Sequence, residues 1–315
     1  MDKLPLLILT GPTAVGKTNL SISLAKAVNG EIISADSMQV YRRMDIGTAK
    51  IKKEEMGGVT HHLIDICEPT EDYNVVRFAT EAKRLIREIV GRGHVPILVG
   101  GTGFYIQAVL YDIDFTETEE NTSYREELAA FAEEHGAEAL HARLAEVDPA
   151  SAEAIHANNV KRVIRALEFY EQTGTKISEH NEEQHGKESA YNSAYFVLTQ
   201  DRAVLYDRIE KRIDIMLAEG LLEEVKGLLA EGCKPESVSM QGLGYKEIVA
   251  YLKGECTLEE AIYILKRDTR HFAKRQLTWF KREREVLWFD KGEYENEDAI
   301  LDAMLEEARA RRIIE

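Results

Sequence analysis

Short apolar runs alternate with helical repeats along the first hundred residues. Residues 6–10 form an apolar run that ends at a glycine, and residues 17–28 repeat apolar positions at the spacing of a helix. The same alternation continues in strands expected at 31–35, 62–66 and 95–99 and in a helix expected at 75–93. Such alternation predicts a parallel sheet with helices on both faces.

The pattern changes at about Thr116. From there the sequence is rich in Glu and Ala at helical spacing, and the next strand candidate is SAYFVLT at 193–199. We therefore predict a helical insert at 117–190, which interrupts an α/β core made of residues 1–116 and 191–315. After the strand at 193–199 the pattern predicts long helices up to the C-terminus.

The motif GPTAVGKT lies between the first strand and the first helix. It matches the phosphate-binding P-loop, in which backbone N–H groups surround phosphate oxygens while a lysine and a hydroxyl serve the phosphates and Mg²⁺. A glycine turn that only joins strand to helix would not need Lys and Thr together. We therefore predict a P-loop NTPase-like α/β core that binds a diphosphate or nucleotide through Gly11, Pro12, Thr13, Ala14, Val15, Gly16, Lys17 and Thr18, with Thr18 as the Mg²⁺ ligand.

A metal-binding acid at the end of a later hydrophobic strand, common in P-loop NTPases and kinases, is not evident. The strand at 95–99 is followed by Gly100, Gly101 and Thr102, and Asp65 is only a weak substitute. The missing acid makes the hypothesis of an NTP-hydrolysing enzyme weaker but does not exclude it.

Asp36 and Thr102 follow two different predicted strands. Because the carboxyl ends of parallel strands gather at one edge of a sheet, we expect both side chains to face the P-loop. A carboxylate there can accept a proton from an incoming nucleophile, and a hydroxyl can bond to the reacting group. The alternative for Asp36 is a helix N-cap, and for the glycines around Thr102 a tight turn.

Charge is distributed unevenly in this acidic chain. The formal net charge is −16, yet residues 266–284 contain eight Lys or Arg against two acidic residues. Arg267, Arg270, Lys274 and Lys281 form a stripe along one predicted helix, and Lys161, Arg162 and Arg165 form a smaller cluster in the insert. A solvated helix face is the alternative, but a stripe this one-sided favours a nucleic-acid backbone.

Arg208 and Arg212 share another helix face, which is either a salt-bridged surface or a phosphate contact. His61 and His62 are interpreted as structural. The three cysteines form no CxxC pair, and no apolar run approaches the roughly 20 residues of a membrane helix. We expect a cytoplasmic protein with no membrane association and no obligate protein partner.

Seven motifs, in order, resemble the tRNA dimethylallyltransferases. They are GPTAVGKT, DSMQVYRRMDIGTAK, HHLIDICEP, VGGTGFYI, RVIRALEFYEQTG, QGLGYKEI and KRQLTWFKRE. The resemblance implies a prenyltransferase that moves the dimethylallyl group from dimethylallyl diphosphate to N6 of the adenine on the 3′ side of the anticodon in tRNA. The P-loop would then hold a diphosphate that leaves, which requires no attacking water.

Carried over to this chain, the resemblance implies Asp36 as general base and Thr102 as its partner at the acceptor nitrogen. Lys17, Arg212, and Thr18 with Mg²⁺ would neutralise the departing diphosphate. The tRNA anticodon stem-loop would be bound by Asp36, Ser37, Met38, Gln39, Thr102, Lys161, Arg162, Arg165, Arg270 and Lys274. Where family members often have two adjacent arginines, this chain has Lys161 and Arg162, which keeps the charge.

Three other functions remain open on the sequence. An adenylate isopentenyltransferase would use free AMP or ATP as acceptor, but it would need neither the insert nor the basic stripe. A P-loop small-molecule kinase would consume ATP. A non-catalytic RNA-binding module would not need the P-loop together with Asp36 and Thr102.

Overall fold

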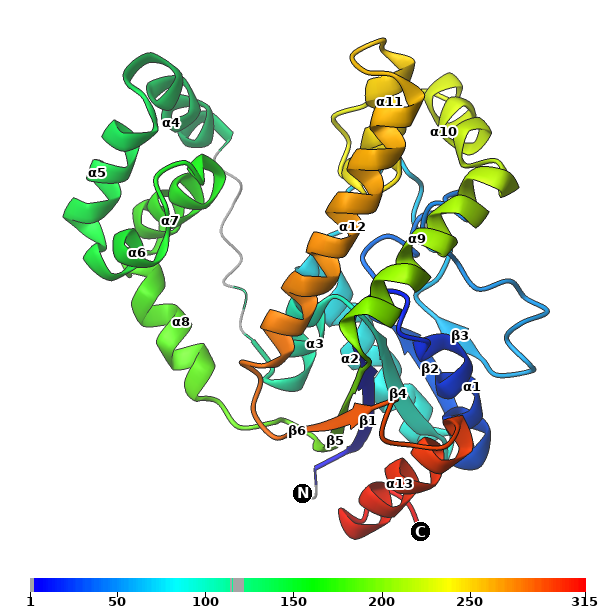
Figure 1. Cartoon of the computed structure of the whole chain (residues 1–315). Helices are drawn as coiled ribbons and strands as arrows, with labels where there is room; N and C mark the ends of the chain where they lie inside the picture. Colours follow the sequence, from blue (N-terminus) through cyan, green and yellow to red (C-terminus); the bar gives the residue numbers. More distant parts are fainter. Residues whose placement is uncertain (1–2, 114, 116–121) are drawn as a thin grey trace. The chain divides into compact units, whose positions relative to one another are not determined.

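The apolar runs of the core form one parallel sheet. The computed structural model describes residues 3–113, 115 and 122–315 (Figure 1). Its strand order is β3-β2-β4-β1-β5-β6, and every described pair is parallel, as the sequence predicted. The strands are β1 (Pro5–Thr10), β2 (Gly30–Ser34), β3 (His61–His62), β4 (Val95–Gly100), β5 (Asn192–Thr199) and β6 (Val286–Asp290).

Helices cover both faces of this sheet. α1 (Lys17–Ala27) and α13 (Glu297–Ala310) pack together, whereas α2 (Val75–Gly91) packs with α3 (Gly103–Leu110). Right-handed crossovers put α1 and α2 on opposite faces, because the chain crosses the sheet in opposite directions through them. The remaining core helices are α9 (Arg202–Glu219), α10 (Leu221–Ala230), the short η1 (Ser239–Gln241), α11 (Tyr245–Leu252) and α12 (Leu258–Phe280), of which α12, orange in Figure 1, packs against α3, α9 and α11.

Two strand expectations were wrong in detail. The strand expected at 62–66 ends at His62, because Leu63 and Asp65 have φ of 62° and 54° and so leave the extended conformation. The long helices expected up to the C-terminus are interrupted by β6, whose five residues pair with β5. β6 completes the edge of the sheet and brings the segment after Asp290 to the same edge as the P-loop.

Contacts between residues divide the chain into two units. One unit contains Met1–Leu110 and Ser189–Glu315, and the other contains Tyr111–Glu188. The second unit consists of α4 (Thr122–His135), α5 (Ala137–Val147), α6 (Pro149–Ala154), α7 (Val160–Thr173) and α8 (Ile177–Gly186) around a core that includes Leu128, Leu140, Leu144 and Val163. No helix among the described residues combines the length and apolarity that crossing a membrane requires.

A carboxylate from α10 anchors the loop at residues 36–50, which carries Asp36. Glu224 accepts hydrogen bonds from the successive backbone N–H groups of Asp45, Ile46 and Gly47 at 2.9, 2.7 and 3.0 Å. It also accepts one from the buried Tyr245 hydroxyl at 2.7 Å. A Cβ at Gly47 would lie 2.6 Å from the Tyr245 ring, so only glycine fits there. Two segments far apart in the sequence, DIG at 45–47 and GLGY at 242–245, are therefore in direct contact.

Lys50 closes the same loop from inside. Its side chain is only 4% exposed, and its amine contacts the Tyr41 carbonyl at 2.6 Å and the carboxylates of Asp45 and Asp65 at 2.7 and 2.5 Å. A buried ammonium requires such full pairing. Asp65, the weak candidate for a metal-binding acid, is therefore used to hold Lys50.

We predict that Tyr245→Phe destabilises the protein. The change removes a buried hydrogen bond to a carboxylate, which contributes about 1.5–3 kcal/mol to the free energy of unfolding. Urea denaturation followed by circular dichroism measures this difference. Tyr263→Phe is the matched control, because the Tyr263 side chain is 64% exposed and should tolerate the loss of its hydroxyl. Equal stability of the two variants would contradict the anchoring role of Glu224 and Tyr245.

Candidate active site

The P-loop is the segment that connects the end of β1 at Thr10 to the start of α1 at Lys17. Gly11 has φ of 145°, and a Cβ there would lie 2.6 Å from the carbonyl oxygen of Leu198 in β5. Gly16 has φ of 98° and precedes α1, whose first turn has no acidic residue and no side-chain cap. The free N–H groups and the positive end of the helix dipole therefore remain available to an anion.

The side chain of Lys17 folds back over the P-loop. Its amine donates hydrogen bonds to the carbonyl oxygens of Gly11 and Pro12, both at 2.9 Å. Burial and, next, the charge of Arg212 lower the pKa of Lys17 to about 7, while Asp36 acts in the opposite direction. These surroundings therefore disfavour the positive charge on Lys17, which a bound phosphate would stabilise.

Arg212 projects from α9 toward the same place. Burial and the neighbouring Arg208 lower its pKa, and Asp36 partly offsets them. No carboxylate lies within 4 Å of Arg212 in the described part of the chain, in contrast to Lys211, which pairs with Asp207 at 2.7 Å. Of the two interpretations of this helix face, the structure favours the phosphate contact for Arg212.

Lys291 is a further cation here, which the sequence did not single out. It follows β6, its side chain is 11% exposed, and its amine pairs with Glu297 at 2.5 Å. A Cβ added to Gly16 would lie 2.9 Å from this amine and 3.3 Å from Arg208 Nη2. The signal that could have located Lys291 is the short apolar run VLWFD, read as a strand ending at the site.

Asp36 caps a turn instead of a helix. Its Oδ1 accepts hydrogen bonds from the N–H groups of Met38 at 2.9 Å and Gln39 at 3.3 Å. The other oxygen has no hydrogen bond to any of the residues that the structure describes. The half-buried carboxylate is close enough to Lys17 and Arg212 to raise the pKa of both. Asp36 thus keeps one oxygen for a proton from an acceptor.

Thr102 lies beside this turn. Its backbone N–H donates to the Ala35 carbonyl at 3.2 Å, and its hydroxyl accepts from the Ser37 N–H at 3.3 Å. A Cβ at Gly100 would lie 2.2 Å from the Ala35 carbonyl oxygen. Any residue other than glycine at position 100 would therefore push the two segments apart. The glycines therefore do more than make a turn: they bring Thr102 to Asp36.

The neighbouring side chains of the DSMQ segment have internal contacts. The Gln39 amide donates to the carbonyl oxygens of Thr48 and Ala49 at 3.2 and 3.4 Å. The Met38 methyl packs against Gly242, so a Cβ added to Gly242 would lie only 2.5 Å from that methyl. Contact of Met38 and Gln39 with a nucleotide stays a prediction.

The basic stripe of α12 is partly neutralised by α9. Arg270 pairs with Glu210 at 2.5 Å, and Lys266 pairs with Asp214 at 2.6 Å. Lys274 is exposed and has no carboxylate within 4 Å among the described residues. In the second unit, Lys161, Arg162 and Arg165 are all exposed on α7, and Arg165 contacts Glu168 at 3.4 Å.

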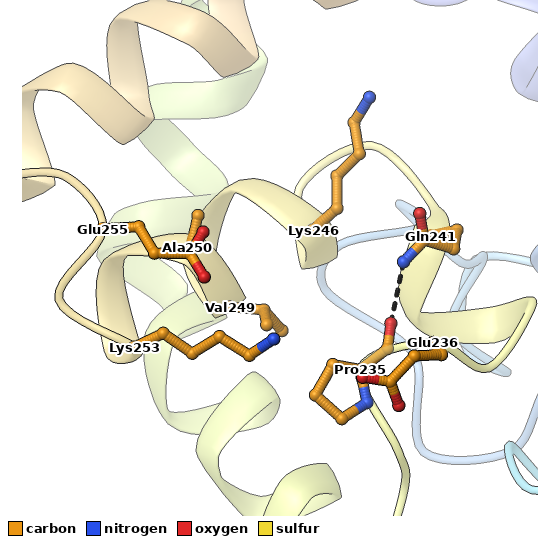
Figure 2. Close-up of a pocket in the computed structure, with 8 residues that line it drawn as sticks. All are labelled: Pro235, Glu236, Gln241, Lys246, Val249, Ala250, Lys253 and Glu255. Carbon is orange, nitrogen blue, oxygen red and sulfur yellow. Dashed lines mark hydrogen bonds between the residues drawn. The ribbon is translucent and has the colours of Figure 1, made fainter. Parts of the chain in front are cut away.

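The described residues contain no cluster of three or more His, Cys, Asp or Glu side chains able to hold a metal ion. Thr18 is exposed at the start of α1 and presents a hydroxyl oxygen. Elsewhere, a pocket lies beside α11 (Figure 2). Its volume is about 230 Å³, and none of the predicted site residues lines it. Its walls are formed by Pro235, Glu236, Gln241, Lys246, Val249, Ala250, Lys253 and Glu255.

Comparison with known proteins agrees with this geometry. Residues 39–283 match the family model described as IPP transferase. The chain is 62% identical to the tRNA dimethylallyltransferase of Lachnoclostridium phytofermentans, covering 98% of this chain and 99% of that protein. It is 54% identical to the enzyme of the same name from Carboxydothermus hydrogenoformans, covering 96% and 97% of the two chains.

Solved structures give the same result. The full-length tRNA isopentenylpyrophosphate transferase of Bacillus halodurans is 47% identical, with a TM-score of 0.74 over 98% of both chains. A eukaryotic dimethylallyltransferase, described as acting on tRNA, is 31% identical with a TM-score of 0.83, over 99% of this chain and 80% of that one. The chain belongs to the tRNA dimethylallyltransferase family of prenyltransferases.

Proposed function

We propose that this protein transfers the dimethylallyl group from dimethylallyl diphosphate to N6 of the adenine on the 3′ side of the tRNA anticodon, releasing diphosphate. The observation that carries the proposal is the meeting of two unlike groups. The first is the positive charge of Lys17 and Arg212 at the P-loop, where Arg212 has no carboxylate within 4 Å among the described residues. The second is the nearby carboxylate of Asp36, one oxygen of which accepts no hydrogen bond from those residues. This arrangement suits a reaction in which an anion leaves while a proton is removed.

The leaving group would be held by the P-loop. As the allylic C–O bond breaks, negative charge grows on the diphosphate. The backbone N–H groups at the start of α1 would bind that charge together with Lys17 and Arg212. Groups that the fold already orients stabilise developing charge without reorganisation.

Magnesium fits this site as a cofactor. Mg²⁺ usually takes one or two protein oxygens and completes its shell with water and phosphate oxygens, so it needs no cluster of acids. The exposed Thr18 hydroxyl would be its protein ligand. When bound, the ion would neutralise part of the diphosphate charge.

The acceptor would be activated from the opposite side. The free Asp36 oxygen would take the N6 proton, and the Thr102 hydroxyl would bond to the same nitrogen. An adenine stacked in a loop must be extruded to reach these groups. Exposed cations on α7 and α12, among them Lys161, Arg162 and Lys274, would hold the anticodon stem-loop by its phosphates meanwhile. Because bacterial tRNA is cytoplasmic, we expect the protein to act there.

The proposal is tested by incubating the protein with Mg²⁺, labelled dimethylallyl diphosphate, and either unmodified tRNA, AMP or ATP. We expect label in adenosine of tRNA and none in the free nucleotides. Nucleoside analysis of a tRNA whose target adenine is replaced by guanine gives the matched control for position. Label in AMP or ATP alone would overturn the proposal in favour of a free-nucleotide acceptor.

We predict that Asp36→Asn lowers kcat by at least about 10²-fold, the usual contribution of a general base. Asparagine can still accept the Met38 N–H bond, so the turn should keep its shape while the base is lost. Asp302→Asn, an exposed change on α13, should leave kcat unchanged. Single-turnover measurement with saturating tRNA reports the difference. Normal turnover of Asp36→Asn would remove Asp36 from the role of base.

We predict that diphosphate binding takes up a proton through Lys17. In the free protein the pKa of Lys17 is about 7, and a bound anion favours the charged amine and raises that pKa. Lys17 is therefore mostly neutral above pH 7 in the free protein and charged in the complex. The affinity for diphosphate should fall as the pH rises above 7.

Calorimetry with inorganic diphosphate at pH 8, in two buffers of different ionisation enthalpy, counts the protons taken up. Lys17→Arg is the matched control, since arginine keeps its charge at this pH and diphosphate titrates equally in both experiments. The wild-type protein should take up more protons than the variant. Equal proton uptake would contradict the prediction.

A further inference from the structure

Gln276 of α12 joins two loops of the candidate active site. The residue is only 6% exposed. The Oε1 atom accepts a hydrogen bond from the Thr13 N–H in the P-loop at 2.9 Å, and Nε2 donates one to the Gly101 carbonyl at 2.9 Å. Gly101 immediately precedes Thr102. One side chain therefore connects the segment that would hold the diphosphate to the segment that would orient the acceptor.

The packing around this amide leaves little freedom. A Cβ at Gly101 would lie 2.2 Å from Gln276 Nε2, and a Cβ at Gly103 would lie 2.3 Å from the ring of Trp279. The loop from Gly100 to Gly103 thus lies directly on α12. Because both contacts involve backbone atoms of the loops, moving Gln276 would move the loops themselves.

The chemistry of the contact requires an amide. The P-loop presents a donor and the glycine loop presents an acceptor, and a glutamine side chain satisfies both at once. Ionised glutamate could accept from Thr13 but would repel the Gly101 carbonyl. Methionine has a similar length but makes neither strong bond.

We propose that Gln276 is a positioning residue, which fixes the distance between the diphosphate on the P-loop and the acceptor at Asp36 and Thr102. This inference rests on the proposed transfer reaction. It also gives the RQLTWF motif a physical role that RNA binding alone does not supply. Misplacement by about 1 Å is enough to lower a rate roughly 10²-fold, so the effect should appear in turnover.

The test compares Gln276→Glu and Gln276→Met with the wild-type protein, using tRNA and dimethylallyl diphosphate. We expect kcat to fall about 10- to 100-fold in both variants, with the Kd for tRNA unchanged. Thr278→Ala is the matched control on the same helix, because Thr278 is exposed and its hydroxyl donates to the Lys274 carbonyl of its own helix. Its kcat should equal that of the wild type.

The Glu variant adds a pH readout that a general loss of stability would not give. Below the pKa of the new carboxyl group, a protonated Glu can donate to the Gly101 carbonyl again. The ratio of its kcat to that of the wild type should therefore rise as the pH falls. Any pH dependence that the two proteins share cancels in this ratio, so the ratio isolates position 276.

The outcomes separate the two proposals. Wild-type turnover in both variants, or a loss confined to tRNA affinity, would overturn the positioning role of Gln276. A flat pH ratio for the Glu variant, with kcat still low, would overturn it as well. An inactive wild-type protein would instead overturn the proposed function.

Discussion

Positive charge that is placed in the core without a matching carboxylate is the constraint on which the site depends. Burial lowers the pKa of both Lys17 and Arg212, and a like charge acts in the same direction on each: Arg212 on Lys17, and Arg208 on Arg212. Such an arrangement opposes folding, because it desolvates like charges close together. It becomes favourable when an anion binds. The geometry that opposes folding is therefore the same geometry that would bind a diphosphate tightly.

The free energy lost by burying these like charges must be offset by interactions elsewhere in the fold. The sheet supplies part of this offset, since β1 lies in the centre and Leu6, Leu7, Ile8 and Leu9 are fully buried. The rest comes from polar anchors. Glu224 holds three successive N–H groups of the loop after Asp36, and Lys50 closes the same loop from within. The carboxylate of Asp36 is thereby placed on a segment with little freedom to move, although that segment belongs to no helix or strand.

The sequence was most informative where chemistry depends on local spacing. GPTAVGKT between a strand and a helix predicted the phosphate grip, and the alternation of apolar runs predicted a parallel sheet that gathers Asp36 and Thr102 beside it. Contacts between residues far apart in the chain could not be predicted from the sequence. Thr13 and Gln276 are separated by 263 positions, and nothing in either segment indicates the other. β6 was missed because its five residues, four of them apolar, follow a strongly basic helix and pair only with a strand almost a hundred residues earlier. The role of DSMQ side chains in nucleotide contact is likewise not decided by spacing.

Counting charges along α12 overstates its free charge. Arg270 and Lys266 pair with acids of α9, so part of the basic stripe stabilises the packing of two helices. Each phosphate contact made by a basic residue releases counterions and steepens the salt dependence of binding. Only cations without an acidic neighbour, such as Lys274, contribute fully to that term. Part of the charge on α12 is therefore used in ion pairs with α9. Under the two proposals, its exposed side would contact phosphates and Gln276 would fix the spacing of the two loops.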